Sequence, residues 1–171
     1  MNGTNRNFFG SDTGNTENVA KLIQNHMGIT DDIFDIARSN KEDLEKYDVL
    51  ILGISTWYYG EAQCDWDEFF PTMKQIDFSG KKVALFGCGD QEDYSEYFCD
   101  ALGTLGDIIE QQGATIVGHW LTSSYNFEAS KGLVNKDYFI GLAIDEDRQP
   151  ELTATRVANW VKQIKYELNI Y

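Results

Sequence analysis

Short apolar segments alternate along the chain with longer segments of helical periodicity, and this alternation limits the possible folds more than any other feature. The longer segments carry apolar residues three and four positions apart, as in 19–27, 102–109 and 157–168. Strands that alternate with helices indicate βαβ units, in which helices cover both faces of a parallel sheet. The short segments rich in Val, Ile, Leu and Phe predict five strands, at 7–9, 33–36, 49–54, 82–86 and 115–119.

Right-handed crossovers between five such strands favour a doubly wound sheet, with helices in a layer on each side. In sheets of this kind a ligand binds beyond the carboxyl ends of the strands, where the direction of winding reverses. We therefore expect the functional loops to follow the first, third and fourth strands. A polar stretch with several aromatic residues interrupts the fifth strand between Trp120 and Phe139, and the strand resumes at 140–144.

Length and composition predict one domain over residues 1–171, because 171 residues with 42% apolar content can bury one continuous core. The net charge of −14 argues against nucleic acid and anionic lipid as partners and favours basic protein surfaces. The polar N-terminus and the strand-sized apolar runs predict a cytoplasmic protein. Cys64, Cys88 and Cys99 are odd in number and form no C-x-x-C pair, so we expect reduced, packed thiols and no metal site.

The loop after the first strand, residues 10–17, is rich in glycine and hydroxyl side chains and leads into a helix. Backbone N–H groups and the dipole of a helix N-terminus, with the hydroxyls of Ser11, Thr13 and Thr16, can hold a phosphate without lysine. An ordinary N-cap is the alternative, since the same residue types are usual there. Neither the G-x-x-x-x-G-K-[ST] motif nor the G-x-G-x-x-G motif is present.

The loops after the third and fourth strands carry aromatic residues where a buried strand ends. Residues 55–61 include three consecutive aromatics, and residues 87–99 combine glycines with aromatic and acidic residues. Each aromatic alone is a common core residue. Their joint placement at neighbouring strand ends indicates a site in which Trp57 and Tyr94 sandwich a planar ring and backbone groups meet its polar edge.

With these three loops in order, the chain resembles the long-chain bacterial flavodoxins, and in particular those of enteric bacteria. The resemblance covers the chain from Phe8 onward, including the late segment 141–145. It implies a flavodoxin-like three-layer sandwich with a five-stranded parallel sheet of order 2-1-3-4-5 and a long-chain insertion at 120–139. It also implies that 11–16 hold the phosphate of a non-covalently bound FMN, that Trp57 and Tyr94 flank its isoalloxazine, and that Asp90 meets its pyrimidine edge.

The function implied is that of a monomeric low-potential one-electron carrier with no catalytic residue and no metal, because the flavin supplies the chemistry. The implied partners are a flavoprotein NADPH reductase and redox acceptor enzymes, which dock on an acidic surface around the flavin. The residues expected to bind the cofactor are Ser11, Asp12, Thr13, Gly14, Asn15, Thr16, Ser55, Thr56, Trp57, Tyr58, Tyr59, Gly60, Gly87, Cys88, Gly89, Asp90, Tyr94, Tyr97, Phe98 and Cys99.

Acidic residues are concentrated in the two aromatic loops. Negative charge near the flavin disfavours its reduction, and segments 57–68 and 87–100 contain no Lys or Arg. We therefore expect a strongly reducing couple. The nine carboxylates of these segments belong to Glu61, Asp65, Asp67, Glu68, Asp90, Glu92, Asp93, Glu96 and Asp100.

Two other functional classes share parts of this pattern. A phosphoacceptor receiver domain needs carboxylates after the first and third strands, where this chain has hydroxyls and aromatics. An FMN-dependent NAD(P)H:quinone reductase on a similar fold remains the alternative function.

The polar run Asn5-Arg6-Asn7 is unusual for a strand that is buried on both faces. Either the strand starts at Phe8 or the protein is less stable than its relatives.

Overall fold

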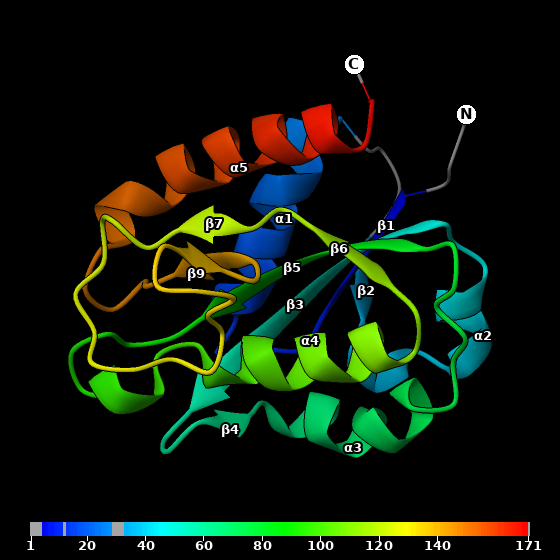
Figure 1. The fold of residues 1–171 in the computed structure, drawn as a ribbon, viewed down its shortest axis with the longest axis horizontal. Helices are drawn as coiled ribbons and strands as arrows, with labels where there is room; N and C mark the ends of the chain where they lie inside the picture. Colours follow the sequence, from blue (N-terminus) through cyan, green and yellow to red (C-terminus); the bar gives the residue numbers. More distant parts are fainter. Residues whose placement is uncertain (1–4, 12, 29–32, 171) are drawn as a thin grey trace.

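The computed structural model describes residues 5–11, 13–28 and 33–170, and its core is a parallel sheet with helices on both faces (Figure 1). The strand order is β2-β1-β3-β5-β6, which is the order 2-1-3-4-5 expected for a doubly wound sheet. A short strand, β4 (Glu61–Ala62), pairs antiparallel with the end of β3. The parallel strands are β1 (Asn5–Phe9), β2 (Phe34–Asp35), β3 (Val49–Trp57), β5 (Lys82–Cys88), β6 (Thr115–Val117) and β9 (Leu142–Ile144).

The helices form two layers around this sheet (Figure 1). Helices α1 (Asn15–Met27) and α5 (Thr153–Glu167) cover one face and bury Ile23 and Trp160 in the first of two apolar clusters. Helices α3 (Cys64–Met73) and α4 (Asp100–Gln111) cover the other face and bury Trp66 and Leu105 in the second. A short helix, α2 (Lys41–Glu45), precedes β3, and single 3-10 turns lie at Ile36–Arg38, Ser95–Tyr97 and Pro150–Leu152.

The last position of the sheet is shared by two strands, as the interrupted fifth strand predicted. β6 pairs with the first half of β5, with Lys82 opposite Thr115, and β9 pairs with its second half, with Phe86 opposite Leu142. The intervening insertion carries a small antiparallel pair of its own, β7 (Trp120–Leu121) and β8 (Tyr138–Phe139). The insertion therefore leaves and rejoins the sheet beside β5, near the end that carries the predicted site.

The first strand begins at Asn5 and not at Phe8, so the polar run belongs to the sheet. Arg6 lies over the ring of Tyr47, with its guanidinium carbon 4.7 Å from the ring centroid. Asn7 is fully buried, and its amide nitrogen donates to the backbone oxygen of Ala20 in α1 at 3.0 Å. Its side-chain oxygen is buried without a hydrogen-bond partner. The structure thus rules out a strand that starts at Phe8, and a stability lower than that of the relatives stays a prediction.

All three cysteines lie in the described part of the chain, and they form no disulfide with one another. Cys88 and Cys99 are buried, but the expectation of a packed thiol was wrong for Cys64, which is exposed because it starts α3 at the protein surface. None of the helices built from the described residues is long and apolar enough to cross a membrane.

Candidate functional site

The loop between β1 and α1 has an open, glycine-bearing turn directly before the helix. Gly14 is the N-cap residue with a φ of 90°, a conformation that favours glycine, and a Cβ built on it would meet no atom within 4 Å. The hydroxyl of Ser11 accepts the N–H of Gly14 at 2.9 Å, which fixes the turn. Asp12 lies outside the described residues. The arrangement suits an anion, because backbone N–H groups at the start of a 13-residue helix lie beside open space.

The start of α1 is joined to the third strand by side-chain hydroxyls. Thr16, in the first turn of α1, is fully buried and its hydroxyl is hydrogen-bonded to the hydroxyl of Ser55 near the end of β3. The next hydroxyl along β3, that of Thr56, accepts the N–H of Ala101 at 2.9 Å in the first turn of α4. The loops after β1 and β3 are therefore held together at one edge of the sheet.

A hollow of about 80 Å³ opens at this edge, where the expected cofactor loops meet. The rings of Trp57 and Tyr94 both line it, and the indole nitrogen of Trp57 is buried without a hydrogen-bond partner. The ring of Tyr58 contacts both of them, with centroid distances of 6.4 Å in each case. The lining residues are Thr13, Asn15, Ser55, Thr56, Trp57, Cys88, Gly89, Asp90, Tyr94, Glu146 and Asp147.

The turn between β3 and β4 has an unusual backbone. Tyr58 has a φ of 47°, in the left-handed region that non-glycine residues seldom adopt, and Gly60 has a φ of 89°. Tyr58 is 57% exposed and Tyr59 is 74% exposed, and the ring of Tyr59 meets that of Tyr97 edge-on at 5.7 Å. Tyr59 and Tyr97 thus form an aromatic rim outside the hollow.

The loop after β5 is organised around Asp90. One carboxylate oxygen of Asp90 accepts the N–H groups of Glu92 and Asp93, both at 2.9 Å. The guanidinium of Arg148 binds both carboxylate oxygens, at 3.1 and 3.2 Å. Burial alone would raise the pKa of Asp90, but these hydrogen bonds outweigh it and lower the pKa. The Asp90 carboxylate is thus engaged by its own loop and by Arg148.

The segment after β9 contributes residues that sequence reasoning missed. Glu146 and Asp147 line the hollow, and Arg148 lies beside it. Burial, reinforced by the charges of Asp90 and Asp145, raises the pKa of Asp147. The available signal was the position of 145–149 directly after the strand that resumes the sheet, because ligands bind at carboxyl ends of strands. Arg148 adds a positive charge beside the acidic loops, whose own segments contain no Lys or Arg.

Three of the expected cofactor residues lie in the interior of the protein. Phe98 is fully buried, and its ring packs against those of Tyr125, Phe127 and Phe139 at 5.4 to 5.8 Å. Cys99 is buried at the start of α4, where burial raises the pKa of its thiol well above the usual value. Gly87 pairs with Ile54 within the sheet. Cys88, by contrast, lines the hollow as a neutral thiol, because burial raises its pKa to about 12.

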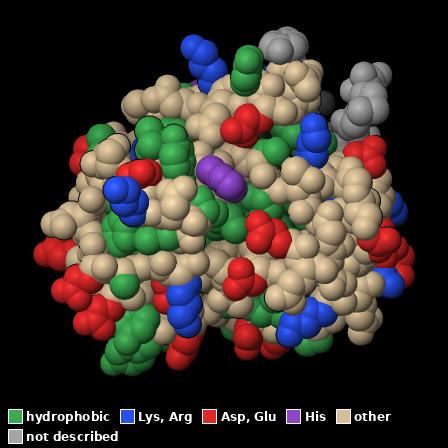
Figure 2. Space-filling view, viewed as in Figure 1, with side chains coloured by type: hydrophobic (Ala, Val, Ile, Leu, Met, Phe, Trp, Pro, Cys, Tyr) green, Lys and Arg blue, Asp and Glu red, His purple; other side chains and the backbone are tan. Residues whose placement is uncertain are grey.

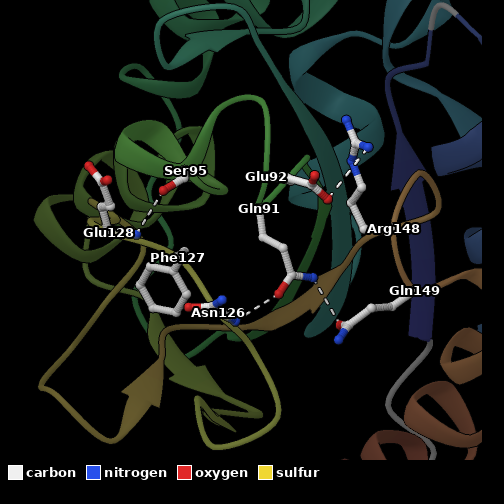
Figure 3. Close-up of a pocket in the computed structure, with 8 residues that line it drawn as sticks. All are labelled: Gln91, Glu92, Ser95, Asn126, Phe127, Glu128, Arg148 and Gln149. Carbon is white, nitrogen blue, oxygen red and sulfur yellow. Dashed lines mark hydrogen bonds and ion pairs between the residues drawn. The ribbon is translucent and has the colours of Figure 1, made fainter.

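A second and larger hollow, of about 460 Å³, lies between the β5 loop and the insertion (Figure 3). Gln91 is its central residue: its amide nitrogen donates to Gln149 at 2.9 Å and to Asp145 at 2.8 Å, and its amide oxygen accepts the N–H of Asn126 at 2.8 Å. The lining of this hollow includes neither a helix N-terminus with a glycine-bearing loop nor two aromatic rings. The smaller hollow is therefore the candidate cofactor site.

The fold and the site define a class: a doubly wound α/β protein with an anion-binding loop and two aromatic walls where the winding of the sheet reverses, between β1 and β3. Among the described residues, no group of three or more His, Cys, Asp or Glu side chains is arranged to hold a metal ion.

The chain belongs to the flavodoxin family. The family model described as "Flavodoxin" matches residues 8–160. Flavodoxin 1 of Escherichia coli (strain K12) is 73% identical over 164 residues, which is 95% of this chain and 93% of that protein. A flavodoxin of Haemophilus influenzae is 66% identical over 94% of this chain and 93% of its own length. The crystal structure of a Fusobacterium nucleatum flavodoxin bound to flavin mononucleotide has a TM-score of 0.90 at 34% identity, covering 96% of this chain and 98% of that one.

Proposed function

We propose that this protein is a low-potential electron carrier that binds one FMN non-covalently in the smaller hollow. The observation that carries the proposal is the meeting of an anion-binding loop, residues 11–16, with the rings of Trp57 and Tyr94 at one edge of the sheet. Family membership supports the same conclusion, because flavodoxins are electron carriers and the structural neighbour from Fusobacterium nucleatum holds FMN. The chain acts as a single domain and as a monomer.

The residues present fit the parts of FMN. Backbone N–H groups at the start of α1 and the hydroxyls of Ser11, Thr13 and Thr16 would hold the phosphate. The rings of Trp57 and Tyr94 would cover the isoalloxazine, and the unpartnered indole nitrogen of Trp57 offers a hydrogen-bond donor at the site. Because Tyr58 is more than half exposed, its ring can turn toward solvent without opening the core. FMN, when bound, would supply the one-electron chemistry.

The side chains around the hollow would control its electrostatics. Asp90, Glu146 and Asp147 place negative charge along the lining and so disfavour the gain of an electron at the site. The aromatic walls exclude water, which would otherwise stabilise a developing negative charge. Both effects lower the reduction potential.

The proposed partners are a flavoprotein NADPH reductase as donor and redox acceptor enzymes, all in the cytoplasm. Acidic side chains gather along the left edge of the face in Figure 2, and exposed hydrophobic side chains stand out at its lower left, over the β3–β4 turn. A net charge of −14 would steer basic partner surfaces to this edge by long-range attraction.

The quinone reductase alternative is not favoured, because the close relatives are flavodoxins and not NAD(P)H-oxidising enzymes.

The test is to purify the protein, record its visible spectrum, and measure both FMN stoichiometry and direct NAD(P)H oxidation. We expect one FMN per chain, reduction through a flavoprotein NADPH reductase, and no direct oxidation of NAD(P)H. Protein that cannot be reconstituted with FMN would refute the carrier function, and rapid direct NAD(P)H turnover would favour the alternative.

A variant pair locates the site. Tyr94→Leu removes one wall and should weaken FMN binding, measured by the quenching of FMN fluorescence, by about tenfold or more. Tyr166→Leu is the matched control, because Tyr166 is 73% exposed on α5 and lies outside the hollow. Equal FMN affinities for the two variants would show that the isoalloxazine ring of FMN does not bind in this hollow.

A further inference from the structure

Arg148 is a cation inserted among the carboxylates of the candidate site. Its guanidinium holds Asp90 through two contacts, reaches a carboxylate oxygen of Asp93 at 2.8 Å, and lies 3.5 Å from one of Glu92 (Figure 3 shows the contact with Glu92). The three carboxylates belong to the loop after β5, whereas Arg148 belongs to the segment after β9. One side chain thus joins two segments that are 58 positions apart and border the same hollow.

Arg148 is itself held in place from its own segment. A carboxylate oxygen of the fully buried Asp145 accepts the N–H of Arg148 at 2.9 Å and that of Asp147 at 3.1 Å. The other oxygen of Asp145 accepts the N–H of Gln91 at 3.0 Å. The backbone on both sides of the ion pair is therefore fixed by one buried carboxylate, and the Arg148 side chain, 32% exposed, needs little further ordering to reach Asp90.

The charges around the hollow make this cation unusual. The described residues that line the hollow include Asp90, Glu146 and Asp147 and no Lys or Arg. Arg148 faces Asp90 directly, and its charge opposes the effects that raise the pKa of Asp147. Removing Arg148 would leave the carboxylates of both segments without their shared counter-charge.

We propose that Arg148 is a positioning residue that orients Asp90 and offsets the carboxylates beside the cofactor site, so that its charge makes the carrier less reducing than the lining alone would. The inference rests on the proposed function as an FMN-binding electron carrier. It assigns Arg148 an effect on the potential through charge, and not merely a role in holding the fold together.

The test compares three variants of the full chain loaded with FMN. Arg148→Gln removes the charge and keeps a hydrogen-bonding group, whereas Arg148→Lys keeps the charge and loses the planar guanidinium. Lys162→Gln is the matched control, because it removes a positive charge from the exposed side of α5. The first readout is the midpoint potential of the bound flavin at low and at high ionic strength. The second is the pKa of the Asp90 carboxyl in the apo-protein, measured by NMR.

For Arg148→Gln we expect more negative midpoint potentials than for the wild type, and a smaller shift at high salt. The shift should correspond to about a threefold decrease in the ratio of the affinity for reduced FMN to the affinity for oxidised FMN. The pKa of Asp90 should rise in the same variant. Arg148→Lys and Lys162→Gln should stay near the wild-type potentials. Wild-type potentials in Arg148→Gln, or equal shifts in the Gln and Lys variants, would overturn the proposal. If the proposed function itself is wrong, the wild-type protein will fail to bind FMN, and that failure is seen before any variant is compared.

Discussion

Replacing Asn7 with valine is expected to stabilise the protein, although it removes a hydrogen bond. Asn7 is fully buried in β1, and its side-chain oxygen has no hydrogen-bond partner. A buried polar atom without a partner costs about 1–3 kcal/mol, and a typical buried hydrogen bond contributes about 1 kcal/mol. The bond that would be lost joins the Asn7 amide to the carbonyl of Ala20, which lies in the middle of α1 and so also has a place in the helical ladder.

The apolar surroundings add to the gain. Asn7 points to the same face of β1 as Phe9, which belongs to the apolar cluster under α1 and α5. A valine side chain would contribute about 1–1.5 kcal/mol by its burial there, and β-branched residues suit strands. The sum is a rise of about 2 kcal/mol in the free energy of unfolding, or about 4–8 °C in Tm for a chain of this size.

The assay is urea denaturation of the apo-protein followed by far-UV circular dichroism, with Asn7→Asp as the control of similar shape. We expect a higher midpoint with an unchanged slope for Asn7→Val, and a lower midpoint for Asn7→Asp, which would bury a charge. A valine variant of equal or lower stability would refute the reasoning, because it would mean that the side-chain oxygen of Asn7 has a partner such as a buried water.

Three further predictions concern the site. Gly14→Val should weaken FMN binding in a fluorescence titration and change the stability of the apo-protein by only about 1–2 kcal/mol, because a φ of 90° strains a β-branched residue but no atom obstructs its Cβ. An unchanged affinity would argue against phosphate binding by this loop. Tyr58→Gly should stabilise the β3–β4 turn by about 1 kcal/mol by relieving a φ of 47°, and a chemical denaturation midpoint below that of wild type would contradict this. Because the pKa of Asp90 is lowered in the folded state, its contribution to stability is complete above about pH 4 and is lost as the pH falls further. Asp90→Asn should therefore lose less stability than the wild type as the pH falls, and an unchanged dependence of stability on pH in acid would contradict the lowered pKa.

The alternation of short apolar segments with helical segments was sufficient to predict the sheet, because the central parallel strands are covered by helices on both faces and are therefore largely apolar. The segments 49–54 and 82–86 lie inside β3 and β5, whose ends extend beyond the apolar runs to Trp57 and Cys88. The strands continue there because Ser55 still pairs with Cys88 in the sheet. Pairing with neighbouring strands, and not hydrophobicity, therefore determines where these strands end.

The site was less predictable, because its members come from segments that only the tertiary structure brings together. Ser11, Trp57 and Tyr94 could be proposed from the ends of strands, but nothing in the sequence near Asp90 indicates that its cation is Arg148. Phe98 is an aromatic residue of the kind that binds a planar ring, yet its ring packs against the aromatic residues of the insertion. Adjacency in sequence to Tyr94 therefore did not predict the direction of its side chain.

The side chain of Gln91 sets limits on how loop lengths can be altered in this protein. Its amide spans from the cofactor loop to Asn126 in the insertion and to Gln149 beside α5, so the insertion is fixed by contacts that also hold the cofactor loop. The insertion is tied to the same loop beyond Asn126 as well, because the N–H groups of Glu128 and Ala129 donate to the backbone oxygen of Ser95 at 2.9 and 3.0 Å. A shortened insertion that deletes Asn126 must therefore supply a new donor for Gln91, and one that deletes 128–129 must supply new donors for Ser95.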